Sequence, residues 1–302
     1  MAERVPPSPP RRYRLSLPRG RELELVAGRP LLLGVVNITP DSFSDGGRYL
    51  APEAAVTHGL SLLAEGADAL DLGAESTRPG GGVYGAGARP VTPEEERQRL
   101  LPVLAALRER TEVPLSVDTR HGEVARDALA AGADLVNDVS ALGDPVMAEV
   151  VAAAGCPLVL MHARGELATM QREIRFHDVV AEVRAELAER VDFAVARGIR
   201  RTQLLVDPGI GFGKTAAQNV ELIARLDDLA ALGQPVLLGA SRKSFVGALT
   251  GAAVDERLPG SLAAALWGAR RGAAILRVHD VAATRQALRL WSELAAAGGR
   301  AA

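Results

Sequence analysis

The fold is decided by a stretch that reads LLVDPGIGFGK at residues 204–214. It begins with a short apolar run that ends in Asp207, and a glycine-rich turn follows. Thr215 and Gln218 then have the spacing of a helix capping box. A continuous apolar run is typical of a parallel strand that is buried on both faces. The stretch therefore predicts a strand, a loop and a helix, with an acidic side chain where the strand ends.

The same pattern of an apolar run followed by a helical segment recurs along the chain. The apolar runs cover residues 32–37, 69–73, 115–118, 135–138, 158–162, 204–207, 236–240 and 275–279. Eight such units without an obvious linker favour a closed (β/α)8 TIM barrel over a doubly wound parallel sheet. We therefore predict an α/β protein with a single barrel over residues 31–298.

The first thirty residues do not follow the barrel pattern. Residues 13–30 hold two alternating segments around a Pro-Arg-Gly turn, which predicts a β-hairpin that caps one end of the core. Residues 1–12 are rich in Pro and Arg, and we expect a flexible tail there. They contain no apolar signal-peptide region, and no window of the chain approaches the length of a membrane span. From these features we expect a cytoplasmic protein.

Composition narrows the class of partner. The net charge is -2, so no general attraction for nucleic acid is expected, and a small-molecule partner is favoured. The single cysteine, Cys156, lies in an apolar run and is interpreted as a structural thiol. Of 35 basic residues only Lys214 and Lys243 are lysines. These two positions are candidates for a compact ammonium that a planar guanidinium cannot replace.

Polar side chains gather where the predicted strands end, which is where TIM barrels build their active sites. Asp118, Asn137, Asp207 and Lys243 lie inside or at the mouth of apolar strands. A buried charge must be paired or bound to a ligand. Two carboxylates, an amide and an ammonium suit a flat heterocycle that carries both donors and acceptors. Other polar residues at strand ends equally fit helix caps: Asp138, Ser241 and Asp280.

A second group of residues has the chemistry of an anion site. Arg78, Arg277 and His279 are cations without matching acids nearby in the sequence. Such a cluster indicates a phosphate-like anion. An oxygen of Asn37 can help to ligate Mg²⁺ that shares the phosphates. A heterocycle end and an anion end are therefore both predicted.

Several single residues have competing interpretations. The loop before Lys214 lacks the four-residue gap of a Walker A motif, so nucleotide hydrolysis is rejected. His162 fits a site or a structural role equally, and no His, Cys and carboxylate spacing indicates zinc. Phe43 in a polar loop favours contact with a second, aromatic substrate. Met161 and Phe212 belong either to the core or against the heterocycle.

Five motifs together resemble a known family. Residues 37–47 (NITPDSFSDGG), 75–80 (ESTRPG), 207–214, 241–244 (SRKS) and 277–281 (RVHDV) are similar to the signature motifs of dihydropteroate synthases, in the same order. The resemblance covers about residues 31–295 and implies a pterin-binding TIM barrel. The implied activity condenses (7,8-dihydropterin-6-yl)methyl diphosphate with p-aminobenzoate, giving 7,8-dihydropteroate and diphosphate in folate biosynthesis.

The resemblance also assigns residues to each part of the site. It implies Asn37 at a Mg²⁺ ion. The pterin side comprises Asp118, Asn137, Met161, Asp207, Phe212 and Lys243. The diphosphate side comprises Thr77, Arg78, Arg277 and His279. The p-aminobenzoate pocket, where sulfonamides bind in the family, comprises Phe43, Pro79 and Ser244. The residues predicted to carry catalysis are Asp118, Asp207, Lys243, Arg277 and His279.

Other features concern assembly and alternatives. The family implies a homodimer, and Trp267 and Trp291 are candidate contacts, although core packing explains them equally well. Residues 80–87 look like an insertion, and Leu167 stands where the family often has proline.

One rival function is a methyltetrahydrofolate-dependent methyltransferase that delivers its methyl group to a corrinoid protein. Another is a pterin-binding paralogue without turnover.

Overall fold

The computed structural model describes residues 11–38, 50–75, 91–165, 169–172 and 174–300. Its centre is an eight-stranded parallel sheet in the order β8-β7-β6-β5-β4-β3-β10-β9. The strands are β3 (Leu31–Asn37), β4 (Ala69–Gly73), β5 (Leu115–Asp118), β6 (Leu135–Asp138), β7 (Leu158–Met161), β8 (Leu204–Asp207), β9 (Leu237–Leu238) and β10 (Ile275–Val278). The predicted TIM barrel is confirmed.

The barrel closes between β8 and β9. Val206 pairs with Val236 in a parallel bridge, and the Val206 N–H donates to the carbonyl of Pro235 at 3.1 Å. Three strands are shorter than predicted, because the chain turns into its loop sooner. The ladder ends before Gly239 in β9, before His162 in β7 and before His279 in β10. The side chains that follow these strands therefore lie at the rim of the barrel.

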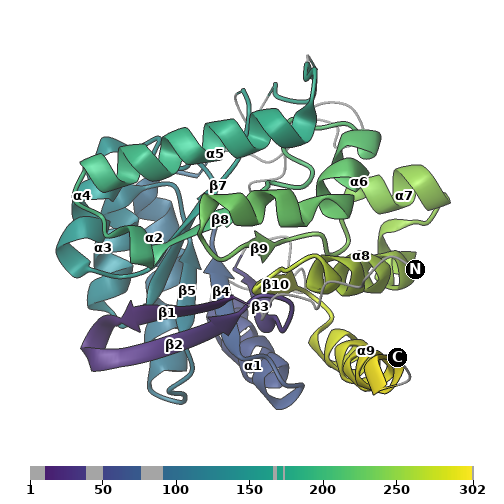
Figure 1. The fold of residues 1–302 in the computed structure, drawn as a ribbon. Helices are drawn as coiled ribbons and strands as arrows, with labels where there is room; N and C mark the ends of the chain where they lie inside the picture. The colour runs from purple at the N-terminus through teal and green to yellow at the C-terminus, as the bar shows by residue number, and fades with distance from the viewer. Residues whose placement is uncertain (1–10, 39–49, 76–90, 166–168, 173, 301–302) are drawn as a thin grey trace.

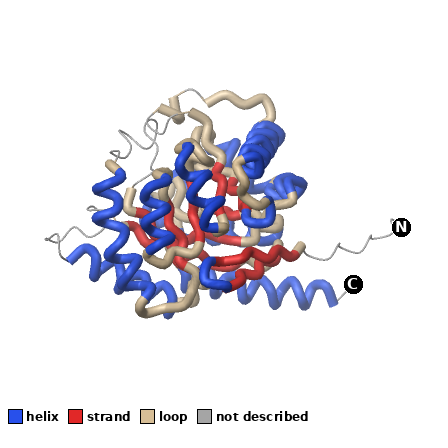
Figure 2. Tube along the Cα trace, turned by 90° about the vertical axis from the view of Figure 1, so that its left-hand side faces the viewer, coloured by secondary structure: helices blue, strands red, loops and turns tan. Residues whose placement is uncertain are grey.

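Helices surround the strands (Figures 1 and 2). They are α1 (Leu50–Ala64), α2 (Pro93–Arg108), α3 (Gly122–Ala130), α4 (Pro145–Ala154), α5 (Val179–Ala196), α6 (Ala216–Ala224), α7 (Ser244–Thr250), α8 (Leu258–Arg270) and α9 (Val281–Arg300). Short 3₁₀ turns are η1 (Pro18–Gly20), η4 (Arg201–Gln203), η5 (Leu226–Leu232) and η6 (Val254–Glu256). The capping box at Thr215 and Gln218 is formed, as its spacing predicted. The largest apolar cluster lies between the strands and these helices.

The predicted N-terminal cap is present as the antiparallel hairpin of β1 (Arg12–Leu17) and β2 (Arg21–Val26). Its inner leucines, Leu15 and Leu25, are buried in one cluster with Leu33, Leu135 and Leu205 from the barrel strands. The cap therefore excludes water from the N-terminal end of the barrel interior.

A buried carboxylate fastens this hairpin to the barrel. Asp134, which is fully buried just before β6, accepts hydrogen bonds from Arg19 at 2.5 Å, from Arg108 at 2.7 Å and from Arg21. It also accepts from the Leu115 N–H at 2.9 Å. One acid thus joins the hairpin turn, helix α2 and strand β5.

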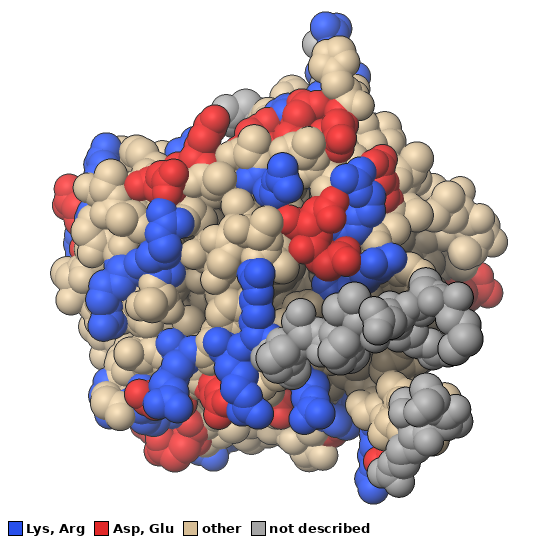
Figure 3. All heavy atoms as spheres, viewed as in Figure 1, with Lys and Arg blue, Asp and Glu red and all other residues tan. Residues whose placement is uncertain are grey.

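The outer surface mixes both signs of charge. Figure 3 shows basic and acidic side chains close to one another on the face that it presents, in keeping with a net charge of -2. In the described part of the chain, the helices are all too short or too polar to span a membrane.

We expect Asp134→Asn to lower the free energy of unfolding by about 3 to 5 kcal/mol, because three arginines lose their buried charged partner. Urea denaturation measures this change. The control is Glu112→Gln, since Glu112 is 90% exposed and 3.9 Å from Arg21, and such a surface pair contributes little. Equal losses for the two variants would contradict the anchoring role of Asp134.

Candidate active site

A pocket lies at the C-terminal ends of the barrel strands. Its empty space, including the part that is open to solvent, is about 490 Å³. Its wall contains residues from strands or loops on most sides of the barrel. The residues predicted from the sequence that line it are Asp118, Asn137, Met161, Asp207, Phe212, Lys243, Arg277 and His279. The structure thus brings together side chains that are up to 161 positions apart, from Asp118 to His279.

Arg277 of β10 lies at the centre of the charged network. Its Nε donates to Asp71 at 2.5 Å and its Nη2 donates to Asp118 at 2.8 Å. The same Asp71 oxygen accepts from the Asn137 amide at 3.1 Å. Burial alone would lower the pKa of Arg277, but Asp71 and Asp118 outweigh it and raise the pKa, so Arg277 stays charged inside the barrel. Arg277 therefore has matching acids, which its sequence neighbourhood did not show.

Asp71 was missed by the sequence analysis. It is fully buried in the middle of β4 and orients both Arg277 and Asn137. The signal was present, because the run ALDLG places one acid among apolar residues. A charge within a strand that is buried on both faces needs a partner inside the barrel.

Asp118 and Asp207 offer acceptors to the pocket. Burial raises the pKa of both carboxyls, and that of Asp118 reaches about 7 although Arg277 opposes the rise. The Oδ1 atom of Asp118 has no hydrogen-bond partner within the described residues. Asp207 accepts from the Gly209 N–H at 2.7 Å. A ligand with N–H groups would satisfy these acceptors.

Lys243 and Phe212 form a part of the pocket wall that offers a cation and an apolar ring instead of acceptor oxygens. The Lys243 ammonium lies 4.3 Å from the centre of the Phe212 ring. Burial lowers the pKa of Lys243 to about 8, with Asp207 opposing the change. Phe212 packs in one apolar cluster with Met161, so these two residues both line the pocket and belong to a small core. The wall is therefore flat and apolar with a cation beside it.

His279 differs from the cation that the sequence suggested. Burial, together with the nearby charge of Arg277, lowers its pKa to about 4. Its ring Nδ1 lies 3.1 Å from the Ser241 hydroxyl, which also accepts from the His279 N–H. His279 is therefore neutral near pH 7 and acts through hydrogen bonds rather than through charge.

The other predicted site residues lie elsewhere. Asn37 is exposed at the end of β3, and β3 pairs with β10, the strand of Arg277. Ser244 is the first residue of α7, next to Lys243, and does not line the pocket. The remaining predicted residues fall outside the described part of the chain, together with residues 80–87 and Leu167: Phe43, Thr77, Arg78 and Pro79.

The structure distinguishes structural roles from pocket-lining roles for the polar residues that the sequence left open. Asp138 accepts from the backbone of Ser140 and Leu142, so it shapes its loop. Asp280 pairs with Arg242. Ser241 lines the pocket, whereas His162 does not. His162 is buried and contacts Glu186 and Lys214, so its role is structural. Cys156 is buried and free, as expected.

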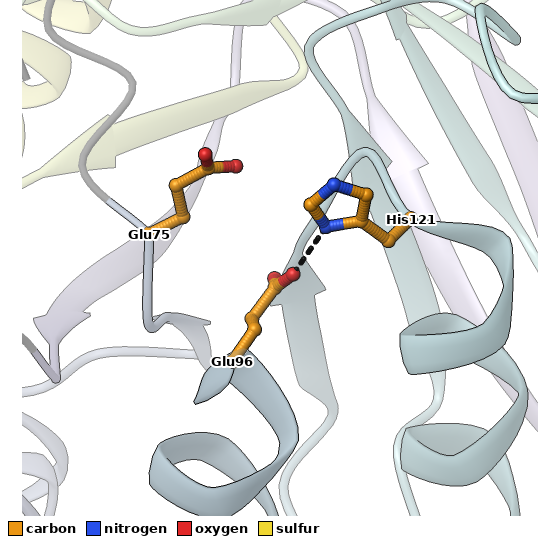
Figure 4. Close-up of side chains that lie close together, drawn as sticks. All are labelled: Glu75, Glu96 and His121. Carbon is orange, nitrogen blue, oxygen red and sulfur yellow. Dashed lines mark hydrogen bonds and ion pairs between the residues drawn. The ribbon is translucent and has the colours of Figure 1, made fainter. Parts of the chain in front are cut away.

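A cluster of Glu75, Glu96 and His121 was also missed, since its members come from three separate segments (Figure 4). Its ligand atoms lie within 4.8 Å of one another. His121 Nδ1 is 2.6 Å from Glu96, and Arg120 donates two hydrogen bonds of 2.9 Å to Glu75. Each carboxylate thus already has a basic partner, and the cluster joins the segment after β4 to the segment after β5.

Comparison with known proteins agrees with this geometry. A model described as "Pterin binding enzyme" matches residues 33–279. The dihydropteroate synthase of Escherichia coli K12 is 43% identical over 272 residues, which cover 90% of this chain and 93% of that protein. The enzyme of Neisseria meningitidis serogroup B is 46% identical over 278 residues, covering 90% and 95%.

Solved structures show the same likeness. A Xanthomonas albilineans dihydropteroate synthase with 4-aminobenzoic acid is 49% identical and superposes with a TM-score of 0.86, covering 95% of this chain and 99% of that one. The X. albilineans enzyme in complex with 7,8-dihydropteroate gives a TM-score of 0.82 at 48% identity, with coverage of 94% and 99%.

Fold and pocket together define a pterin-binding barrel enzyme. Within that class, the chain belongs to the dihydropteroate synthase family. It is a transferase that makes 7,8-dihydropteroate from (7,8-dihydropterin-6-yl)methyl diphosphate and p-aminobenzoate in folate biosynthesis. The corrinoid methyltransferase is therefore set aside.

Proposed function

We propose that the pocket at the C-terminal ends of the strands holds the pterin of the diphosphate substrate, through Asp118, Asn137, Asp207 and Lys243. The observation that carries this proposal is the set of buried acceptors beside the half-buried ammonium of Lys243. The amino-pyrimidinone edge of a pterin offers adjacent N–H donors to a carboxylate. Its carbonyl and ring nitrogens accept from Lys243 and Asn137. The ring lies against Phe212 and Met161.

The diphosphate end lies toward Arg277 and His279, with Thr77 and Arg78 assigned to it by the family motif. Arg277 is held in place by Asp71 and Asp118, so its orientation is fixed before substrate arrives. His279 is neutral, and it contributes a hydrogen bond to the leaving group while Arg277 contributes the charge.

Asn37 is proposed as the protein ligand of Mg²⁺. Its carboxamide is the kind of oxygen donor that Mg²⁺ accepts alongside substrate phosphates. Its exposed position on the strand beside β10 fits an ion shared with a diphosphate near Arg277. When bound, the ion supplies positive charge to the departing oxygens. Glu75 and Glu96 are less suited, since Arg120 and His121 already occupy them.

The proposed reaction is dissociative. The bond between the pterin methylene carbon and the diphosphate oxygen breaks first, and both electrons leave with the diphosphate. Asp118 and Asp207 stabilise the resulting pterin-methyl cation, and Arg277 stabilises the leaving charge. The amine of p-aminobenzoate then attacks the carbon and releases a proton. No side chain is assigned as general base, because a cation accepts even a weakly basic amine.

Finer assignments belong to the same proposal. Phe43, Pro79 and Ser244 are assigned to p-aminobenzoate, and sulfonamides are expected to compete there. The X. albilineans structures with 4-aminobenzoic acid and 7,8-dihydropteroate support these ligand classes.

A cytoplasmic homodimer is proposed, with Trp267, which is 39% exposed, as one contact. The division into a tail, a hairpin and one barrel, at residues 1–12, 13–30 and 31–298, is kept as a proposal.

The decisive experiment incubates the purified protein with dihydropterin-methyl diphosphate and Mg²⁺, with and without p-aminobenzoate. We expect diphosphate release coupled to dihydropteroate formation when both substrates are present. Chelation of Mg²⁺ is expected to suppress the release. Pterin binding without any release would contradict the proposed turnover, and absence of pterin binding would contradict the pocket assignment.

The raised pKa of Asp118 predicts a pH dependence. A carboxyl with a pKa of about 7 is protonated below that pH and then cannot accept two N–H bonds. Affinity for the pterin should therefore rise from about pH 6 through the pKa of Asp118, until Lys243, with a pKa of about 8, begins to lose its charge. Calorimetry with 6-hydroxymethyl-7,8-dihydropterin measures this, since that ligand carries no diphosphate. Asp118→Asn should remove the step, and an identical step in that variant would contradict the assignment.

A further inference from the structure

The second of the two lysines, Lys214, has no part in the mechanism above. Its side chain is only 3% exposed and does not line the pocket. Its Nζ lies 2.9 Å from the carbonyl of Phe212, 3.0 Å from that of Gly209 and 3.3 Å from that of His162. A fourth contact, of 2.9 Å, joins it to His162 Nδ1. The ammonium is thus enclosed by acceptors.

The loop that surrounds this ammonium packs tightly on the end of β7. Gly209 and Gly213 have positive φ angles of 66° and 63°. A Cβ at Gly209 would lie 1.8 Å from the carbonyl oxygen of His162, and one at Gly213 would lie 2.7 Å from that of Arg164. The loop backbone therefore lies close to the carbonyls after β7, and because Gly209, Phe212 and His162 are buried, their carbonyls need a hydrogen-bond donor.

The contacts of Lys214 also determine which ring nitrogen of His162 carries the proton. Burial lowers the pKa of Lys214 to about 7, with Asp207 opposing the change, and the carbonyls around Nζ favour the protonated form. In that form Lys214 only donates, so His162 Nδ1 accepts and its Nε2–H donates to Glu186 at 3.0 Å. Burial lowers the pKa of His162 to about 4, which agrees with a neutral ring. Lys214 is therefore linked through His162 to helix α5.

The same loop forms one wall of the pterin pocket. Ile210 and Phe212 line the pocket, and the Gly209 N–H donates to Asp207. The Phe212 ring in turn contacts the Lys243 ammonium. The two carbonyls that Lys214 binds in this loop, those of Gly209 and Phe212, belong to residues that touch the site directly.

We propose that Lys214 is a positioning residue for the pterin substrate: its ammonium fixes the turn that presents Phe212 to the pterin ring and the Gly209 N–H to Asp207. This inference rests on the proposed function of the pocket. A compact ammonium can direct its three donors to the three acceptors within 3.0 Å, which are the carbonyls of Phe212 and Gly209 and His162 Nδ1, with the His162 carbonyl at 3.3 Å as a longer shared contact. A planar guanidinium does not fit this arrangement. This explains a lysine in a chain that otherwise uses arginine at every basic position but one.

The test is Lys214→Met, which keeps the length of the side chain and removes its donors. We expect the Kd for dihydropterin-methyl diphosphate, measured by calorimetry, to rise about ten-fold or more, since several bonds from a charged donor are lost. The KM for p-aminobenzoate should change less than about two-fold. Lys214→Gln, which keeps two donors, should lie between Lys214→Met and the wild type.

Asp134→Asn is the matched control, because Asp134 is also buried and accepts hydrogen bonds from four residues, but it lies at the opposite end of the barrel. It should lower the unfolding temperature without changing the pterin Kd. A Lys214→Met protein that is equally destabilised but binds the pterin as the wild type does would overturn the positioning role.

The remaining outcomes are also decisive. If Lys214→Met does not fold, Lys214→Gln is measured alone, and an unchanged pterin Kd there overturns the proposal. Wild-type protein that binds no pterin diphosphate would overturn the function of the pocket, and this inference with it. Wild-type binding with unaltered affinity in the Lys214 variants overturns only the role of Lys214.

Discussion

The site depends on one interaction inside the barrel, the pairing of Arg277 with Asp71 and Asp118. Carboxylates in a closed parallel barrel are unfavourable unless a cation compensates them. Arg277 supplies that cation from β10, and Lys243 adds a second one near Asp207. Because most of this charge is balanced before substrate arrives, the free acceptor of Asp118 remains available for a ligand. The barrel thus holds a polar site whose central cation, Arg277, is paired with two carboxylates.

Contacts at the N-terminal end of the barrel stabilise the fold, whereas the residues of the proposed site lie at the C-terminal end. At the N-terminal end, Asp134 gathers three arginines and the hairpin closes the interior. At the C-terminal end, acids and cations again lie close together, and there they line a pocket. This division is general in TIM barrels, where loops after the strands carry function and the opposite face carries stability.

Much of this arrangement could be predicted from the sequence. Eight apolar runs predicted the barrel, and the residues at or after their ends predicted eight side chains of the pocket wall, of which six are polar and two, Met161 and Phe212, are apolar. Asp71 was missed although it stands alone among apolar residues in its strand, and its partner Arg277, 206 positions away, is shown only by the structure. The neutral state of His279 and the enclosure of Lys214 depend on burial, which a sequence pattern does not measure. Glu75, Glu96 and His121 likewise meet only in three dimensions.

The central claim is that buried carboxylates at the strand ends bind the pterin. It is tested most directly by calorimetry of dihydropterin-methyl diphosphate with wild-type protein and Asp207→Ala. Removing one partner of a buried charged hydrogen bond costs about 2 to 5 kcal/mol, so the account predicts a Kd at least ~30-fold higher in the variant. Equal affinity for the pterin diphosphate in both proteins would contradict it.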